Sequence, residues 1–423
     1  MARKVAYLMS RFPKISETFI LYEMLALERL GLKIEVFPLI REHEPISHPE
    51  AQAIVERMHW RPPYSRDVFA AQWYWLRQSP LAYLRAWGHA IRGNVRVPSF
   101  LLRALLIVPQ AALYARRMQA LDIDHMHAHW ATHPTLAAYV IHLLTGIPYS
   151  FTAHAHDIYA ERPMLETKLR HAAFAVTISE YNRQFLQQLY GPVATERMVV
   201  IHCGIDPDVF QPRTPVRHQD ALTLLCVGRL EAQKGHPYLI DACARLKHAG
   251  ISFCCQLVGE GKDRQRIEKQ IEQLGLDAKI VLLGQQPRLR VHELLDQADI
   301  VILPSVTTPN GRKEGIPVAL MEALAMGKPC ISTAISGIPE LIEDGRTGLL
   351  VPERDAQALA DAVQRLHEAP AWGRQLALAG REKVLQAFNL QTTTQTLYDL
   401  LTHETVPMVD VAGDIQLVTE EVL

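Results

Sequence analysis

The chain has 423 residues, of which 48% are hydrophobic and 21% are charged, and its formal net charge at pH 7 is -1. This length is enough for two or three ordinary domains, and the composition is typical of a globular protein and not of a disordered one. A net charge so close to zero argues against a general nucleic-acid binder, so no nucleic-acid partner is expected.

The six cysteines form no Cys-x-x-Cys pair, and most lie in apolar strand or helix contexts. We therefore expect reduced cysteines, no zinc site built from them, and a cytoplasmic location. The first nine residues lead directly into a predicted strand without the long apolar core of a signal peptide. The apolar region 97–115 is interrupted by Pro98, Arg103 and Pro109, so the sequence predicts no membrane-spanning helix there.

The chain opens with a strand–loop–helix–strand unit, at residues 5–9, 17–30 and 34–39, which is typical of a doubly wound α/β domain. The loop contains no glycine and is therefore not a dinucleotide fingerprint. It can still present side chains to a ligand at the carboxyl edge of the sheet. The acceptor-side candidates in this loop are Ser16, Glu17 and Thr18.

Residues 60–117 combine nine arginines with one aspartate, Asp67, and with several tryptophans and tyrosines. Basic and aromatic residues on amphipathic helices suit an anionic membrane surface or an anionic carrier such as a lipid diphosphate. The alternative is a set of ordinary surface helices whose arginine stems cover the core. The sequence leaves both interpretations open. In the first, the protein would lie at the inner face of the cytoplasmic membrane.

Three histidines, His125, His127 and His129, alternate along a predicted strand and should share one face of it. A metal site is one interpretation, but no carboxylate nearby in the sequence completes a well-known ligand pattern. The preferred alternative places these histidines near a strand end beside a cleft between domains. No metal is therefore expected.

A second polar cluster, His154, His156 and Asp157, follows the predicted strand 148–152. The carboxyl ends of parallel strands are where α/β sheets bind ligands, so these three residues are further acceptor-side candidates. The alternative for His154 is a histidine of the core with satisfied hydrogen bonds. Strand 199–202 closes this first domain.

The pattern then restarts with a strand at 222–228, followed by Arg229 and Lys234 in the turn before a helix. Two cations at a helix N-terminus after a parallel strand can hold a diphosphate. Further strands are predicted at 253–258, 280–284, 300–303 and 348–351. The chain therefore contains two α/β domains, and the cleft between them is the default site.

The stretch after strand 300–303 carries two carboxylates, Glu314 before a helix at 317–326 and Glu322 inside it. A carboxylate among apolar side chains is costly unless hydrogen bonds are donated to it, and a sugar diol can donate two. The helix N-terminus also offers free N–H groups to a phosphate. The alternative is that Glu322 faces water and Glu314 is an ordinary loop charge.

Several motifs together resemble a known family. They are GRL at 228–230 with KG at 234–235, EGIP at 314–317 with Glu322, SGIPE at 336–340 and GRTGL at 345–349. These are similar to retaining family-four glycosyltransferases of GT-B fold. RFP at 11–13, SETFI at 16–20 and FTAHAHD at 151–157 resemble the branch that serves bacterial exopolysaccharide or colanic-acid synthesis. The resemblance extends to about Leu401.

The resemblance implies two Rossmann-like doubly wound domains that face each other across a cleft. The N-terminal, acceptor-binding domain would span 1–207 and the nucleotide-sugar domain 221–388. A linker at 208–220 would join them, a helix at 389–403 would pack back on the first domain, and 404–423 would form a loose tail.

The resemblance also implies roles for individual residues. Arg229 and Lys234 would hold the donor diphosphate, and Glu322 would bind the ribose hydroxyls. The catalytic pair would be His154, beside the anomeric carbon and the acceptor, and Glu314, which binds a hydroxyl of the donor sugar. The amides of Gly315 and Ile316 would lie near the sugar and phosphate.

The function expected is retaining transfer of a sugar from a nucleotide-diphosphate sugar to a saccharide acceptor, which we expect to be lipid-linked. The nucleotide sugar is a substrate, and neither a cofactor nor a metal is expected, because Arg229 and Lys234 can stabilise the leaving group. A sugar-nucleotide hydrolase or epimerase on the same fold is the alternative, with His154 and Asp157 as an additional acid/base pair. A non-catalytic membrane adaptor using residues 60–117 is a third interpretation.

Overall fold

The computed structural model describes residues 2–14, 17–42, 49–212 and 221–403. Ser16, most of the predicted linker and the predicted tail lie outside the described residues. The chain divides into an N-terminal unit, Met1–Ile201 with Thr394–Leu423, and a C-terminal unit, His202–Thr393. The first segment of the N-terminal unit thus ends at Ile201, a few residues before the domain boundary at 207 that the sequence suggested.

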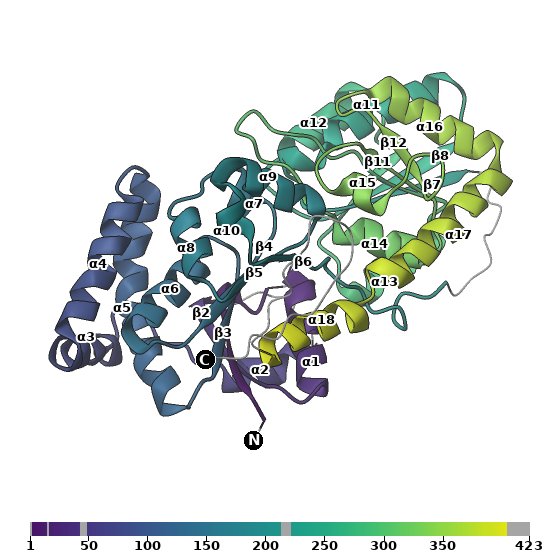
Figure 1. The fold of residues 1–423 in the computed structure, drawn as a ribbon. Helices are drawn as coiled ribbons and strands as arrows, with labels where there is room; N and C mark the ends of the chain where they lie inside the picture. The colour runs from purple at the N-terminus through teal and green to yellow at the C-terminus, as the bar shows by residue number, and fades with distance from the viewer. Residues whose placement is uncertain (1, 15–16, 43–48, 213–220, 404–423) are drawn as a thin grey trace. The chain divides into compact units, whose positions relative to one another are not determined.

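The N-terminal unit contains a six-stranded parallel sheet of order β2-β1-β3-β4-β5-β6 (Figure 1). Its strands are β1 (Lys4–Phe12), β2 (Lys33–Arg41), β3 (His125–His129), β4 (Tyr149–Ala153), β5 (Phe174–Thr177) and β6 (Met198–Val200). Its helices before β3 are α1 (Thr18–Arg29), η2 (Pro49–Ala51), α2 (Gln52–Arg57), α3 (Arg66–Gln78), α4 (Pro80–Asn94) and α5 (Pro98–Ala120). The later helices are α6 (His133–Thr145), α7 (His156–Tyr159), α8 (Leu165–His171), α9 (Glu180–Tyr190) and α10 (Pro192–Thr195).

Both faces of this sheet are covered, which is why its strands are apolar on both sides. Successive residues of β1 alternate between two separate clusters: Ala6 and Leu8 belong to one, and Val5 and Tyr7 to the other. The first cluster is completed by helices α3 to α6 and the second mainly by α1. The predicted doubly wound architecture is confirmed for this unit.

The last described helix, α18 (Leu390–Thr402), returns to the N-terminal unit. Leu397 and Leu401 are buried in the same cluster as Val5. Arg3 also donates a hydrogen bond from Nη1 to the carbonyl oxygen of Thr402 over 2.8 Å. The end of the described chain therefore covers the face of the sheet that its first strand helps to form.

The apolar region that begins near residue 97 forms one continuous helix, α5, so the interruption inferred from its prolines was wrong. Pro98 occupies the first helical position, where a missing N–H costs little, and Pro109 lies inside the helix. Within the described residues, α5 is the one helix long and apolar enough to cross a membrane. Of its apolar 18-residue segment, 56% is buried inside the protein. Its buried residues, such as Val108 and Ala111, belong to the N-terminal core, as expected for a core helix.

The C-terminal unit contains a second parallel six-stranded sheet, of order β12-β11-β10-β7-β8-β9. Its strands are β7 (Leu222–Val227), β8 (Phe253–Val258), β9 (Ile280–Gly284), β10 (Ile300–Leu303), β11 (Cys330–Thr333) and β12 (Leu349–Val351). Its helices are η3 (Ala232–Lys234), α11 (His236–His248), α12 (Arg264–Gln273), α13 (Arg288–Gln297), α14 (Val318–Ala325), α15 (Ile338–Leu341), α16 (Ala356–Glu368) and α17 (Pro370–Ala387). One hydrophobic core joins them. The strand order brings β7 beside β10, so the loops that follow these two strands lie at one edge of the sheet.

Candidate functional site

In the C-terminal unit, two predicted donor-site residues come into direct contact. The Nζ of Lys234, at the end of η3, lies 3.0 Å from Oε2 of Glu314. Only 14% of the Lys234 side chain and 15% of the Glu314 side chain are exposed. The pair is therefore an ion pair largely removed from bulk water, in which each charge stabilises the other.

The loop after β7 is held against the loop after β10 by a close backbone approach. Gly235 has φ +69°, and a Cβ atom there would lie 1.8 Å from the carbonyl oxygen of Pro304. The amide of Val306 also donates to the carbonyl oxygen of Gln233 over 2.9 Å. Only glycine fits at position 235, and this fit places the neighbouring Lys234 next to Glu314.

The segment around Glu314 is fixed from the backbone side. Ser336 donates from Oγ to the carbonyl oxygen of Glu314 over 2.6 Å. Gly315 and Ile316 are buried, and Pro317 occupies the position just before α14. The first amides of α14 belong to the four that a helix leaves without a partner inside the helix. The Ser-Gly-Ile-Pro motif thus serves to hold the Glu-Gly-Ile-Pro motif in place.

Arg229 lies in the same turn as Lys234 but is oriented differently. Its Nη1 lies 2.9 Å from Oε1 of Glu231, and 54% of its side chain is exposed. The structure therefore pairs the Arg229 guanidinium with Glu231, while Lys234 pairs with Glu314. An exposed guanidinium can exchange such a partner for a ligand phosphate at little cost.

Glu322 lies inside α14 and is only partly exposed, among buried apolar neighbours such as Met321 and Ala323. Burial raises the pKa of Glu322 to about 7, and the positive charge of Arg288 acts in the opposite direction. The carboxyl does not face open water, so the alternative interpretation of an ordinary solvent-exposed charge is disfavoured. Hydrogen bonds donated by a ligand would favour its ionised form.

In the N-terminal unit, His154 follows β4 and is 4% exposed. Rings of Trp130 and Phe19 lie 4.3 Å and 4.9 Å from its ring centroid. Burial, followed by the charges of His129 and His156, holds the pKa of His154 well below its ordinary value. His154 is therefore a neutral imidazole at pH 7.

Asp157 is held by hydrogen bonds from the backbone of two loops. Its carboxylate accepts hydrogen bonds from the backbone amides of Ala131, His154 and Ala155, at 2.7, 3.1 and 2.8 Å. It is 1% exposed. Asp157 thus fixes the loops after β3 and β4 and positions His154, and its oxygens are already used.

The other acceptor-side candidates lie near the same ends of the strands. Glu17 pairs with Lys14, whose Nζ lies 2.6 Å from its Oε1, and Thr18 begins α1. His156 is exposed, with its ring centroid 4.5 Å from that of Trp130. Ser16 lies outside the described residues.

The three alternating histidines of β3 are buried, and His129 is the last residue of that strand. Both His125 and His127 contact Oγ of Ser150 over 2.8 Å, which confirms that they share a face. The second nitrogen of His127 lies 2.9 Å from Oγ1 of Thr152. Burial lowers the pKa of His125 to about 3 and that of His127 well below its ordinary value, so both rings are neutral.

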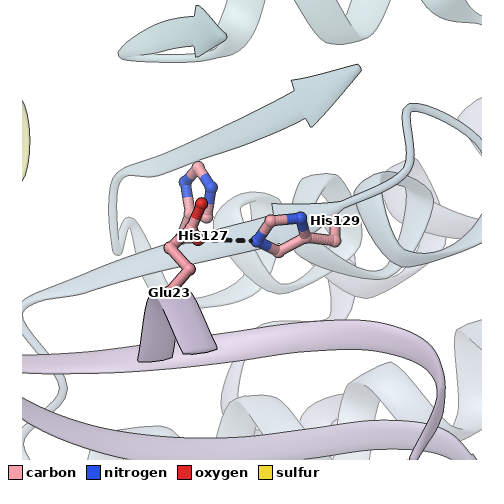
Figure 2. Close-up of side chains that lie close together, drawn as sticks. All are labelled: Glu23, His127 and His129. Carbon is pink, nitrogen blue, oxygen red and sulfur yellow. Dashed lines mark hydrogen bonds and ion pairs between the residues drawn. The ribbon is translucent and has the colours of Figure 1, made fainter. Parts of the chain in front are cut away.

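Sequence reasoning missed Glu23, which supplies the carboxylate that the histidine cluster seemed to lack (Figure 2). Potential ligand atoms of Glu23, His127 and His129 lie within 4.8 Å of one another. The Oε1 of Glu23 lies 2.9 Å from Nε2 of His129. The signal available in the sequence was the position of Glu23 on the apolar face of α1, between Ile20 and Leu27, a pattern that Glu322 repeats in α14.

Comparisons with known proteins identify the family of the chain. The family model described as Glycosyltransferase Family 4 matches residues 16–209, and the model described as Glycosyl transferases group 1 matches residues 210–383. WcaL of Escherichia coli K12, assigned as a colanic acid biosynthesis glycosyltransferase, is 30% identical over 94% of this chain and 99% of its own length. AmsK of Erwinia amylovora, an amylovoran biosynthesis glycosyltransferase, is 39% identical over 49% of this chain and 51% of its own.

Solved glycosyltransferase structures share the fold. A glycosyltransferase from Rickettsia africae superposes with a TM-score of 0.71 at 18% identity, covering 95% of this chain and 100% of its own. Anabaena HepE, solved in complex with UDP and glucose, gives a TM-score of 0.67 at 18% identity, covering 95% and 99%. The two parallel-sheet units and the matches over both halves lead to one conclusion: the chain belongs to the family-four glycosyltransferases and has the GT-B fold.

Proposed function

We propose that this protein transfers a sugar from a nucleotide-diphosphate sugar to a saccharide acceptor, with retention of anomeric configuration, during synthesis of an exopolysaccharide. The observation that carries the proposal is the Lys234–Glu314 pair beside the start of α14. The similarity to WcaL and AmsK supports the exopolysaccharide assignment, and the UDP complex of HepE supports a nucleotide-sugar donor.

Departure of the nucleoside diphosphate leaves negative charge on the β-phosphate, and two cations are available to stabilise it. Lys234 is held in place by Glu314, and Arg229 is exposed in the same turn. Cations fixed before the reaction stabilise the transition state without reorganisation. We therefore propose that the transfer needs neither a metal nor another cofactor.

Glu314 and Glu322 would bind hydroxyl groups of the donor. Glu314 lies next to the phosphate-binding lysine, so a sugar hydroxyl can donate to it while the diphosphate lies on Lys234. The partly buried Glu322 carboxyl would accept from the ribose diol, and the amides of Gly315 and Ile316 complete the donor contacts.

In a retaining transfer the acceptor hydroxyl attacks from the face that the phosphate leaves, and the departing phosphate can take up its proton. The N-terminal unit would bring the acceptor, with His154 contributing as a neutral imidazole. A hydrolase or epimerase would need an additional acid/base pair on this unit. Because the Asp157 carboxylate is occupied by three backbone amides, the pair considered for that role is disfavoured.

The acceptor is proposed to be lipid-linked, because helices α3 to α5 present a basic and apolar surface. One side of α4 exposes Leu81, Leu84 and Ile91 with Arg85 and Arg92, and Val95 follows directly after this helix. The adjoining part of α5 exposes Leu102, Leu105 and Leu106. Figure 1 shows the three helices side by side. No aspartate or glutamate occurs between Asp67 and Asp122. Such a surface suits anionic lipid at the inner face of the cytoplasmic membrane.

The decisive experiment uses the full chain and a panel of sugar nucleotides. The donor should raise the melting temperature, and adding lipid-linked saccharides should then yield a product whose new bond keeps the donor's anomeric configuration by NMR. Excess chelator should leave the rate unchanged. Free sugar or an epimer formed without any acceptor would contradict the proposal, as would a product of inverted configuration.

A further inference from the structure

A continuous hydrogen-bonded chain connects four side chains that come from different parts of the N-terminal unit. Tyr7 donates from its hydroxyl to Oε1 of Glu23 over 2.8 Å, and Nε2 of His129 lies 2.9 Å from the same oxygen. Nδ1 of His129 lies 3.2 Å from Nε2 of His154. Figure 2 shows how Glu23, from α1, points at His129 of β3.

The direction of each hydrogen bond follows from the chemistry of the groups. Burial, and then the charge of Glu23, raise the pKa of Tyr7 well above its ordinary value, so its hydroxyl keeps its proton and donates it. An ionised carboxylate only accepts, so Nε2 of His129 must carry the hydrogen. When His129 carries this one hydrogen only, its Nδ1 bears a lone pair, and Nε2 of His154 is the donor to it. Because His154 is neutral, its Nδ1 is left as an acceptor.

The same cluster also resembles a metal site, but its nitrogens are already occupied. Both ring nitrogens of His127 contact hydroxyls, and both ring nitrogens of His129 contact Glu23 and His154. A metal ion would have to displace at least two of these contacts at a place where both histidines are buried. The geometry therefore favours a hydrogen-bonded chain.

We infer that Glu23 and His129 are positioning residues that hold His154 in its Nε2–H tautomer and keep Nδ1 free to accept a proton or a hydrogen bond from a substrate hydroxyl. The consequence for sugar transfer rests on the proposed function, whereas the tautomer itself does not. The other groups that face His154 are the Trp130 and Phe19 rings, the exposed His156 and the backbone-bound Asp157.

The first test measures the tautomer directly. The full chain is labelled with ¹⁵N-histidine, and long-range ¹H–¹⁵N spectra are assigned to His154 by the signals lost in His154→Gln. The wild type should show the Nε2–H pattern. Glu23→Leu should shift His154 toward a mixture of tautomers, whereas Glu28→Leu should not, because Glu28 lies on the same helix but pairs with Arg57 at the surface.

Glu23→Leu leaves the buried Tyr7 hydroxyl without its acceptor, so a Tyr7→Phe/Glu23→Leu double variant provides the same test without that cost. Glu23→Gln keeps an amide oxygen that can accept from His129, so it should retain the wild-type tautomer. An unchanged His154 spectrum in both Glu23→Leu and the Tyr7→Phe/Glu23→Leu double variant would overturn the inference. Stoichiometric zinc binding by the wild type that is lost in Glu23→Leu would overturn it as well.

The second test measures turnover with the donor and acceptor found for the wild type. The Tyr7→Phe/Glu23→Leu double variant should lose at least about tenfold in kcat, while the KM for the donor changes little, because the hydrogen-bonded chain of side chains lies in the acceptor-side unit. Glu23→Gln should recover most of the loss. Equal losses in both variants would contradict positioning through the tautomer. If the wild type transfers no sugar, the proposed function fails, and the spectra still decide the tautomer.

Discussion

The ammonium group of Lys234 lies 3.0 Å from the Glu314 carboxylate, although the two residues are 80 positions apart in the chain. Lys234→Ala should weaken donor binding and turnover by about 2–4 kcal/mol, because a partly buried charge-assisted contact to the diphosphate is lost. Calorimetric titration and steady-state kinetics measure the effect. Lys247→Ala, which removes an exposed lysine of α11, should change neither quantity. Unchanged kinetics for Lys234→Ala would refute the diphosphate role.

Donor affinity should rise with pH because of Glu322. Its pKa is about 7 in the free protein, and hydrogen bonds donated by the ribose favour the ionised carboxylate. The carboxyl must lose its proton for the donor to bind below pH 7 and is already ionised above it. Affinity should therefore increase about tenfold between pH 6 and pH 8.

Glu322→Gln should remove this pH dependence and weaken binding of the nucleoside diphosphate. The control ligand is the 2′,3′-dideoxy analogue, which has no diol to donate and should be affected little by the substitution. If both ligands lost affinity equally, Glu322 would not be the ribose contact.

Gly235→Ala should destabilise the C-terminal unit through two separate costs. A left-handed backbone costs a residue with a Cβ about 1–2 kcal/mol, and here the Cβ would also collide with the carbonyl oxygen of Pro304. Gly250→Ala is a matched control, since its φ is +75° but no atom lies within 4 Å of the added Cβ. Urea unfolding should show a larger loss for Gly235→Ala. Equal losses would mean that the loops after β7 and β10 can separate at little cost.

Acidification should destabilise the N-terminal unit through its buried histidines. The pKa of His125 is about 3 in the folded protein and 6.5 as a free side chain, so below pH 6.5 the unfolded chain takes up a proton that the folded one excludes. Stability present above pH 6.5 is thus lost as the pH falls, by about 2 kcal/mol for this histidine between pH 7 and pH 5. Urea unfolding of His125→Phe at both pH values should show a correspondingly smaller loss. The exposed His367→Phe should behave like the wild type, and a His125→Phe profile identical to both would contradict the assignment.

Replacing Arg77, Arg85 and Arg92 together by glutamine should reduce binding to vesicles that contain anionic lipid, by about 1 kcal/mol for each arginine. Co-sedimentation with vesicles of phosphatidylglycerol and phosphatidylcholine measures the change. Removing three exposed cations of the C-terminal unit, Arg266, Lys269 and Arg374, is the matched control for net charge. Equal losses in the two triple variants would show a general charge effect without a docking surface.

The strand topology could be predicted from the sequence, and it decides which loops lie next to one another. The carboxyl ends of neighbouring parallel strands meet at one edge, and this is why a lysine after β7 and a glutamate after β10 lie close together in the structure. The apolar strands, buried on both faces, likewise indicated two doubly wound sheets.

The parts that the sequence did not predict depend on contacts without a local signal. The Glu23–His129 contact joins residues 106 positions apart, from a helix and a strand, and no spacing rule connects them. The role of Asp157 depends on which way its carboxylate turns, toward the loop amides or toward a ligand. Pro109 is accommodated within α5, where the surrounding packing outweighs the hydrogen bond that proline cannot make.

The return of α18 to the first sheet has a practical consequence for anyone who wishes to study one half of this enzyme. A truncated protein that ends at Ile201 lacks Leu397 and Leu401, so the hydrophobic cluster that β1 and α1 help to form loses the part contributed by α18 and is exposed there. We expect such a truncation to aggregate during expression, so the N-terminal unit should be produced with α18 joined to the first 201 residues.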